Sequence, residues 1–221
     1  MRNIEFAQGE YYHLCNRGVD KRQITQGARD SERFIQSLDD FNTTTPTGGL
    51  FAMSTDKRNR DQQLDVLKNG KPLVNIICYC LNPNHFHLLL EEITENGIAR
   101  FMHKISMGYS KYFNAKYRRT GALFSGPFRA RRISNNDDLL HTSIYVGLNY
   151  KVHQYGSIAS KLVRSSWDEY AQKKSGLCKK EIILDQFKNP HEYEKFANET
   201  LSLIIDKKFD NRALESLGIE L

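Results

Sequence analysis

Hydrophobic and polar positions divide this chain into segments with distinct strand and helix periods. Residues 11–16 alternate as a half-buried strand does, and an apolar stripe over residues 34–41 recurs at helical spacing. From 43 to 71 the periodicity dissolves into turn-rich and charged sequence, which predicts a solvated loop insertion. Residues 73–81 are mostly β-branched and apolar, so they predict a strand.

The second half of the pattern continues with a hairpin and two helices. Asn82-Pro83-Asn84 is turn chemistry, and the strand that begins at His85 follows at once, so an antiparallel hairpin is expected. Apolar residues at three- and four-residue steps predict a long helix from Gly97. A further strand is predicted to begin at residues 122–124, followed by a helix that starts at the capping pair Asn135-Asn136.

Composition narrows the class of protein. The 221 residues suit one domain with an extension or two small domains, and 39% hydrophobic with 26% charged residues is a globular composition. We expect no membrane span and no signal peptide, because no apolar run is long enough. Four cysteines without metal-type or framework spacing favour a reduced, cytoplasmic protein. The net charge of +6 leans towards a polyanionic partner.

Two histidines provide the first candidate chemistry. His85 and His87 lie two apart on a predicted strand, so both point to the same face, whereas Phe86 points to the other. Two imidazoles on a rigid strand are a ready pair of metal ligands, but a metal needs at least a third. Taken alone, the pair favours the plainer interpretation, in which both histidines merely lie on the solvent-exposed face of an antiparallel strand.

The last predicted helix carries the complementary residues. His141, Tyr145 and Asn149 are spaced four and four and share one helical face. A core tyrosine with polar neighbours is the plain interpretation. Beside the histidine pair, Asn149 becomes a candidate third ligand and Tyr145 a candidate nucleophile. His141 is a candidate to position the phenol or carry its proton, although exposed helix histidines are common.

Basic residues interleaved with aromatic ones predict a nucleic-acid surface, since cations neutralise phosphates and rings stack on bases. On the long helix and its tail, solvation is an equally good explanation of the charges. The predicted DNA-binding residues are Arg17, Lys104, Lys111, Arg118, Arg119, Arg129, Arg131, Arg132, Phe124 and Phe128.

These motifs resemble a known family. His85-Phe86-His87 is similar to the His-hydrophobic-His motif of the HUH single-strand endonucleases, and residues 145–149 (YVGLN) resemble the tyrosine helix of the IS200-like (Y1) transposases. The branch of REP-associated tyrosine transposases resembles it most, with further local matches at residues 13–18, 82–87 and 117–124. The chain departs from that pattern at Gly147 and at Tyr150, where the branch usually has proline.

The resemblance implies an α+β fold with a ferredoxin-like antiparallel sheet, ordered β-α-β-β-α-β-α. It places the catalytic domain at 1–156, with the 43–71 insertion, and a helical extension at 157–221. The implied activity is metal-dependent cleavage and transfer of single-stranded DNA near hairpins, through a 5′-phosphotyrosine at Tyr145. Mg²⁺ or Mn²⁺ would be held by His85, His87 and Asn149.

Two other functions remain open at this stage. A protein that kept the fold but lost the chemistry would bind hairpin DNA without cutting it. A replication initiator of the HUH class would use the same chemistry, although such proteins usually carry additional domains. The sequence leaves open whether the protein is a monomer or a dimer, and it does not give the target DNA sequence.

Overall fold

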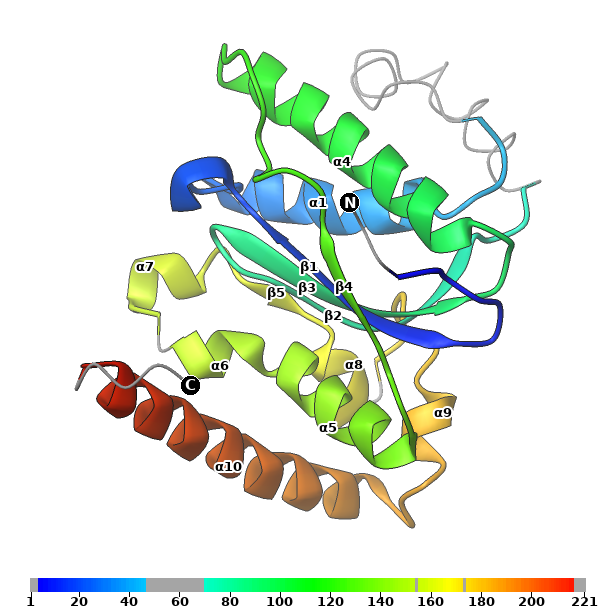
Figure 1. Ribbon diagram of the computed structural model, residues 1–221, viewed down its shortest axis with the longest axis vertical. Coiled ribbons are helices and arrows are strands. Elements are labelled where there is room, and N and C mark those ends of the chain that lie inside the picture. Colours follow the sequence, from blue (N-terminus) through cyan, green and yellow to red (C-terminus); the bar gives the residue numbers. More distant parts are fainter. Residues whose placement is uncertain (1–3, 47–69, 154, 173, 217–221) are drawn as a thin grey trace.

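The computed structural model describes residues 4–46, 70–153, 155–172 and 174–216, with side chains for all of these except 158 and 209–216. Its centre is a five-stranded antiparallel sheet in the order β4-β1-β3-β2-β5 (Figure 1). The strands are β1 (Tyr11–Arg17), β2 (Val74–Leu81), β3 (His85–Glu92), β4 (Arg129–Arg132) and β5 (Arg164–Ser165).

Helices cover both faces of this sheet. α1 (Ala28–Asp40) and α4 (Gly97–Lys116) lie side by side on one face, and α5 (Asn136–Gly147) and α6 (Asn149–His153) lie on the other (Figure 1). The long α10 (Pro190–Ser216) packs on the outside of α5 and forms a further layer. The short elements are η1 (Val19–Lys21), α7 (Ser157–Ser160), α8 (Trp167–Ala171) and α9 (Glu181–Leu184).

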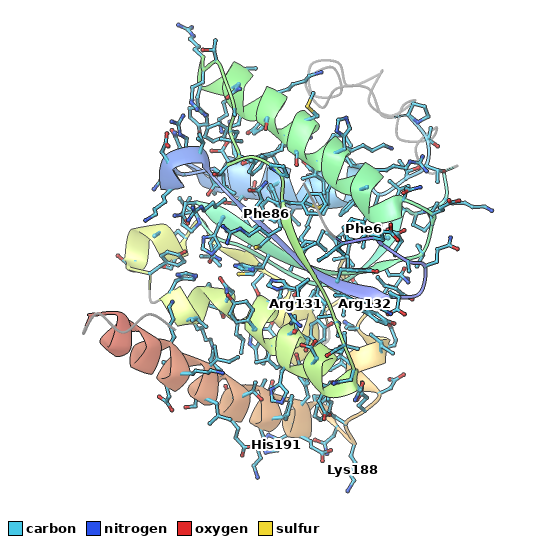
Figure 2. All side chains as sticks on the ribbon, in the orientation of Figure 1. Phe6, Phe86, Arg131, Arg132, Lys188 and His191 are labelled. Carbon is cyan, nitrogen blue, oxygen red and sulfur yellow. The ribbon has the colours of Figure 1, made fainter. Side chains whose placement is uncertain are left out.

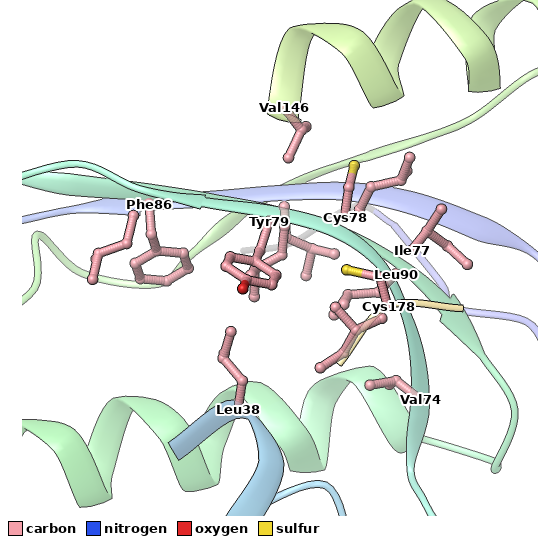
Figure 3. Close-up of a cluster of buried hydrophobic side chains, with 14 of the residues drawn as sticks. Leu38, Val74, Ile77, Cys78, Tyr79, Phe86, Leu90, Val146 and Cys178 are labelled. Atoms are coloured by element: carbon pink, nitrogen blue, oxygen red, sulfur yellow. The ribbon is translucent and has the colours of Figure 1, made fainter. Parts of the chain in front are cut away.

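The alternation of side chains along β2 and β3 supplies the two faces of the sheet with different residues. Phe86 and Leu90 point towards α1, where they face Leu38, whereas Cys78 of β2 points towards Val146 of α5 (Figure 3). All five are buried, with at most 1% of their surface exposed. Phe86 therefore packs into the core on the α1 side of the sheet, and His85 and His87 project from the opposite face.

The helix that carries Tyr145 begins and ends where its sequence dictates. The Asn135 side chain accepts a hydrogen bond from the Asp138 N–H at 2.9 Å, which satisfies one of the free donors of the first turn. α5 ends at Gly147, and α6 begins two residues later at Asn149. Tyr145 and Asn149 therefore stand on consecutive helices rather than on one, yet both face the sheet.

The predicted ferredoxin-like fold is confirmed by the strand order and by the succession of strand, helix, hairpin, helix, strand and helix. The prediction of a strand at 122–124 is wrong. Phe124 makes one isolated bridge with Gly18, and β4 begins only at Arg129. The extension is not purely helical either, because β5 pairs with β2 and completes the sheet edge.

Most of the predicted 43–71 insertion, residues 47–69, lies outside the described residues. Within the described part of the chain, the helices are too short or too polar to cross a membrane. The four cysteines all lie in that part and are free thiols.

Candidate active site

The histidine pair lies where β3 begins, in the middle of the sheet. His87 stands opposite Cys15 of β1 and Cys80 of β2, and His85 stands opposite Arg17, the last residue of β1. Since β3 is hydrogen-bonded on both sides, neither histidine can shift without breaking the sheet. The strand therefore presents two rigidly placed imidazoles to the helices above.

His85 has a defined protonation pattern. Its Nδ1 lies 2.7 Å from the Asn84 Oδ1, which can only accept, so the proton is on Nδ1. The lone pair on Nε2 then accepts from the Asn82 Nδ2 at 3.0 Å. The same Nδ2 donates to the Asn149 Oδ1 at 2.8 Å, and this oxygen is 3.3 Å from the His85 Nε2. Two lone-pair acceptors, the His85 Nε2 and the Asn149 Oδ1, thus lie next to each other.

His87 is more buried than His85, with 8% of its surface exposed. Its Nδ1 lies 2.9 Å from the Nε2 of His13, and the two rings stack with centroids 5.1 Å apart. Burial lowers the pKa of both imidazoles, and that of His13 falls to about 4. The two histidines are therefore neutral at pH 7 and available as ligands or hydrogen-bond partners.

The Tyr145 ring packs edge-on against the rings of His87 and His13. Its ring centroid is 5.4 Å from that of His87 and 5.7 Å from that of His13. Burial raises the pKa of the phenol, and the neighbouring amide of Asn149 acts in the opposite direction. Asn149 is fully buried, and its Nδ2 has no hydrogen-bond partner among the residues that the structure describes. The site thus holds an unused amide donor beside the phenol.

Three of these residues line one cavity of about 450 Å³. Its wall includes His85, His87 and Tyr145, and its rim includes Arg17 and Arg129. It is also lined by residues that the sequence interpretation did not single out, namely Lys21, His153 and Tyr155.

One of these additional residues, His153, could have been found from its spacing in the sequence. His153 follows Asn149 by four residues and so continues the spacing of Tyr145 and Asn149, and its ring lies 4.8 Å from that of His85. His13 could not be found by spacing, because its contact with His87 spans 74 residues of sequence. Only the pairing of β1 with β3 brings the two together.

The chemistry of this donor set fits a divalent metal ion. Within the described residues, no group of three or more His, Cys, Asp or Glu side chains is arranged to hold a metal, so the Asn149 oxygen would be needed as a ligand. The 3.3 Å between the His85 Nε2 and the Asn149 Oδ1 matches the roughly 3 Å between adjacent ligands of an octahedral ion bound at about 2.1 Å. His87 would be the third ligand.

Comparison with known proteins identifies a similar family. The sequence matches the family described as Transposase IS200 like over residues 64–149, a stretch that contains both strand histidines, Tyr145 and Asn149. Residues 64–149 are therefore similar to the IS200-like transposases.

A solved structure supports the same conclusion at the level of fold. The chain is similar to a REP-associated tyrosine transposase bound to a REP hairpin, with a TM-score of 0.50 and 15% sequence identity. The similarity covers 78% of this chain and 86% of the other. A search of curated proteins found no match.

The fold divides the predicted DNA-binding residues between two faces of the sheet. Arg17 and Arg129 stand at the rim of the cavity. Lys104 and Lys111 are on α4, which covers the opposite face of the sheet, and Lys104 donates to the carbonyl oxygens of Thr43 and Thr45. These two lysines are therefore remote from the histidines.

The remaining predicted cations have protein partners or lie beyond α4. Arg131 forms a bidentate ion pair with Asp138 at 2.7 and 2.9 Å, and Arg132 pairs with Glu10 at 2.6 Å. Both arginines are labelled in Figure 2. Arg118 and Arg119 follow the end of α4, where the Arg119 guanidinium lies over the ring of Phe113. Whether any of these residues contacts DNA stays a prediction.

The two predicted stacking rings are core residues instead. Phe124 and Phe128 are each only 7% exposed. Phe124 packs edge-on against Phe86 at 5.7 Å, and Phe128 stacks on Phe6 at 6.3 Å. The prediction that they stack on bases is wrong, because the core already occupies the faces that a base would need.

His141 lies one turn before Tyr145 but on the side of α5 that meets α10. It is exposed, and its ring centroid is 5.7 Å from that of Phe196. It lines, together with His13 and Tyr145, a smaller cavity of about 330 Å³. Its predicted role towards the phenol stays a prediction.

Proposed function

We propose that this protein is a metal-dependent single-strand DNA endonuclease and strand transferase, with Tyr145 as the nucleophile. One observation carries the proposal: His85 and His87 of β3 and Tyr145 of α5 line one cavity together with Arg17 and Arg129, and the Asn149 Oδ1 of α6 lies 3.3 Å from the His85 Nε2. The similarity of residues 64–149 to the IS200-like transposases supports the same reaction class.

The reaction exchanges one phosphoester for another. The Tyr145 oxygen attacks the phosphorus of a DNA phosphodiester, a bond from phosphorus to the tyrosine forms, and the bond from phosphorus to the 3′ oxygen breaks. The phenol loses its proton and the departing 3′ oxygen gains one. A 5′-phosphotyrosine and a free 3′ hydroxyl result, and the retained ester can later be attacked by a 3′ hydroxyl to rejoin the strand.

The protein prepares Tyr145 for this step through its surroundings. The phenol must be deprotonated to attack, and burial alone disfavours its anion. The unpaired Nδ2 of Asn149 opposes that effect, because an N–H donor nearby stabilises negative charge on the phenol oxygen or on the phosphate. Contacts with His13 and His87 hold the ring in place while its oxygen reacts.

His85, His87 and Asn149 would hold Mg²⁺ or Mn²⁺. When bound, the ion would polarise the phosphate and offset its negative charge. The contribution of the chain is geometric: Asn84 directs the His85 Nε2 lone pair towards the Asn149 oxygen, and the sheet fixes both imidazoles.

The substrate we propose is an unpaired strand next to a hairpin. Arg17, Lys21 and Arg129 at the rim of the cavity can neutralise the phosphates on either side of the scissile one. The similar solved transposase is bound to a hairpin, which supports hairpin DNA as the ligand here.

A single denaturing gel tests the nucleophile. Wild-type protein is incubated with Mn²⁺ and labelled hairpins with single-stranded flanks, taken from the DNA around its own gene. It should form an SDS-resistant adduct and a cleaved strand, and Tyr145→Phe should form neither while still binding the DNA. Tyr155→Phe is the matched control, because Tyr155 is the other phenol in the cavity and its loss should preserve the adduct. An adduct that persists in Tyr145→Phe would show that the nucleophile is misassigned.

The same gel separates the proposal from its first rival. If the wild-type protein only binds hairpins, it should give no cleaved product at any metal concentration, while a native gel run beside it should still show bound DNA. That result would reject the nuclease and leave the binding function standing.

A further inference from the structure

The two strand histidines are oriented in the same way, although by different partners. His85 has its Nδ1 hydrogen-bonded by Asn84 and its Nε2 turned to the Asn149 oxygen. His87 has its Nδ1 hydrogen-bonded by His13. In both rings Nδ1 is engaged by a neighbouring side chain, so Nε2 is the nitrogen left for a ligand.

We propose that His13 is a positioning residue, which accepts a hydrogen bond from the His87 Nδ1 and thereby keeps the lone pair of the His87 Nε2 free for the metal ion. A neutral imidazole carries its proton on one nitrogen only, and the partner of the other nitrogen decides which. If His13 donated instead, the His87 proton would sit on Nε2 and block coordination. The inference rests on the proposed metal site.

The register of the sheet fixes His13 beside His87. β1 pairs with β3 on one side, where His13 stands opposite Leu89, and with β4 on the other, where it stands opposite Arg131. Arg131 is held there by its ion pair with Asp138. Pairing on both sides thus fixes the backbone of His13, and its Nε2 lies 2.9 Å from the His87 Nδ1.

The contacts of His13 on its other side strengthen the case for a positioning role. Its ring stacks on His87 with an interplanar angle of 16° and meets Tyr145 edge-on at 82°. One side chain thus touches both a proposed ligand and the proposed nucleophile. Hydrogen-bond partners of metal ligands fix ring orientation and tautomer, and their loss typically lowers metal affinity 10–100-fold.

The first experiment observes the tautomer directly, without metal or DNA. Long-range ¹H–¹⁵N correlation spectra at pH 7 distinguish a protonated from an unprotonated imidazole nitrogen by chemical shift. Wild-type protein should show His87 with its proton on Nδ1. His13→Phe, which keeps an aromatic ring but has no acceptor, should move the proton of His87 towards Nε2. A wild-type His87 protonated on Nε2 would overturn the proposal.

The second experiment measures Mn²⁺ binding by the loss of the free-ion EPR signal. His13→Phe should bind Mn²⁺ on the order of 10–100-fold more weakly than wild type. His13→Gln should recover most of the affinity, because its side-chain oxygen can accept the same hydrogen bond. His103→Phe, which removes an exposed histidine from α4 on the far face, is the matched control and should bind as wild type does.

The outcomes separate this inference from the proposed function. Equal Mn²⁺ affinity of wild type and His13→Phe, with His85→Ala unable to bind, would reject the role of His13 and leave the metal site intact. Equal affinity of wild type and His85→Ala would reject the metal site and this inference with it. If His13→Phe fails to fold, His13→Gln decides alone: loss of both the Nδ1 proton and Mn²⁺ affinity in that folded variant would count against the hydrogen bond.

Discussion

The ion pair at the start of the tyrosine helix offers a quantitative test of how α5 is held over the sheet. Asp138 accepts two hydrogen bonds from Arg131 of β4, at 2.7 and 2.9 Å. It also accepts from the Ser134 N–H at 2.9 Å and from the Thr142 hydroxyl at 3.1 Å. We therefore expect Asp138→Asn to loosen the attachment of α5 to β4.

The cost can be assembled from these contacts. The ion pair is worth about 1 kcal/mol, since the Arg131 side chain is 53% exposed and solvent screens it. A negative charge in the first turn of a helix contributes about 0.5 kcal/mol, and a weakened bond to a backbone N–H costs up to about 1 kcal/mol. Asp138→Asn should thus lose about 2 kcal/mol, which lowers the thermal midpoint by roughly 4–8 °C for a chain of this size.

The shifted pKa of Asp138 determines how its contribution to the free energy of unfolding changes with pH. The hydrogen bonds from Arg131 lower the pKa of Asp138 well below its usual value. The stabilisation is therefore fully present above the unfolded-state pKa of about 4, and it is lost as the pH falls through the depressed folded-state pKa. The difference between wild type and Asp138→Asn should be largest near neutral pH and should shrink below pH 4.

Thermal unfolding followed by circular dichroism, at pH 7 and pH 3, measures both effects. Asp137→Asn removes a neighbouring exposed carboxylate from the same helical turn and serves as the control, with a clearly smaller shift expected. Equal shifts for the two variants, or a difference that does not shrink at pH 3, would refute the assigned role of the Arg131–Asp138 pair.

Two further predictions concern the DNA surface. Arg129→Ala should weaken single-strand binding and reduce the slope of log affinity against log salt by about 0.7. Arg132→Ala should change the slope less, because the Arg132 guanidinium already pairs with Glu10. Fluorescence anisotropy over a salt series measures both slopes, and equal slopes for the two variants would contradict the prediction. Phe124→Ala should cost about 3–5 kcal/mol of stability because it opens a cavity in the core, yet the folded variant should bind single strands as wild type does. Selective loss of binding without loss of stability would reinstate Phe124 as a stacking residue.

Local sequence was sufficient wherever period and spacing decide the structure. Alternation along β3 placed His85 and His87 on one face, because a strand has a period of two whatever its neighbours are. The four-residue step from Tyr145 to Asn149 placed these two residues together, even though the helix breaks between them. The succession of elements in the sequence agreed with the ferredoxin-like sheet that the family resemblance implied, and the structure confirms that sheet.

Tertiary structure decided everything that depends on which segments become neighbours. The aromatic residues near β4 were predicted to form a binding surface, but Phe124 and Phe128 face the core. The local sequence could not show this, because burial depends on how the whole chain packs. Arg131 looked like a phosphate ligand until α5 brought Asp138 to it. His13 begins a segment that resembles the family, but no spacing linked it to His87, because only the pairing of β1 with β3 brings its ring against that of His87, 74 residues away.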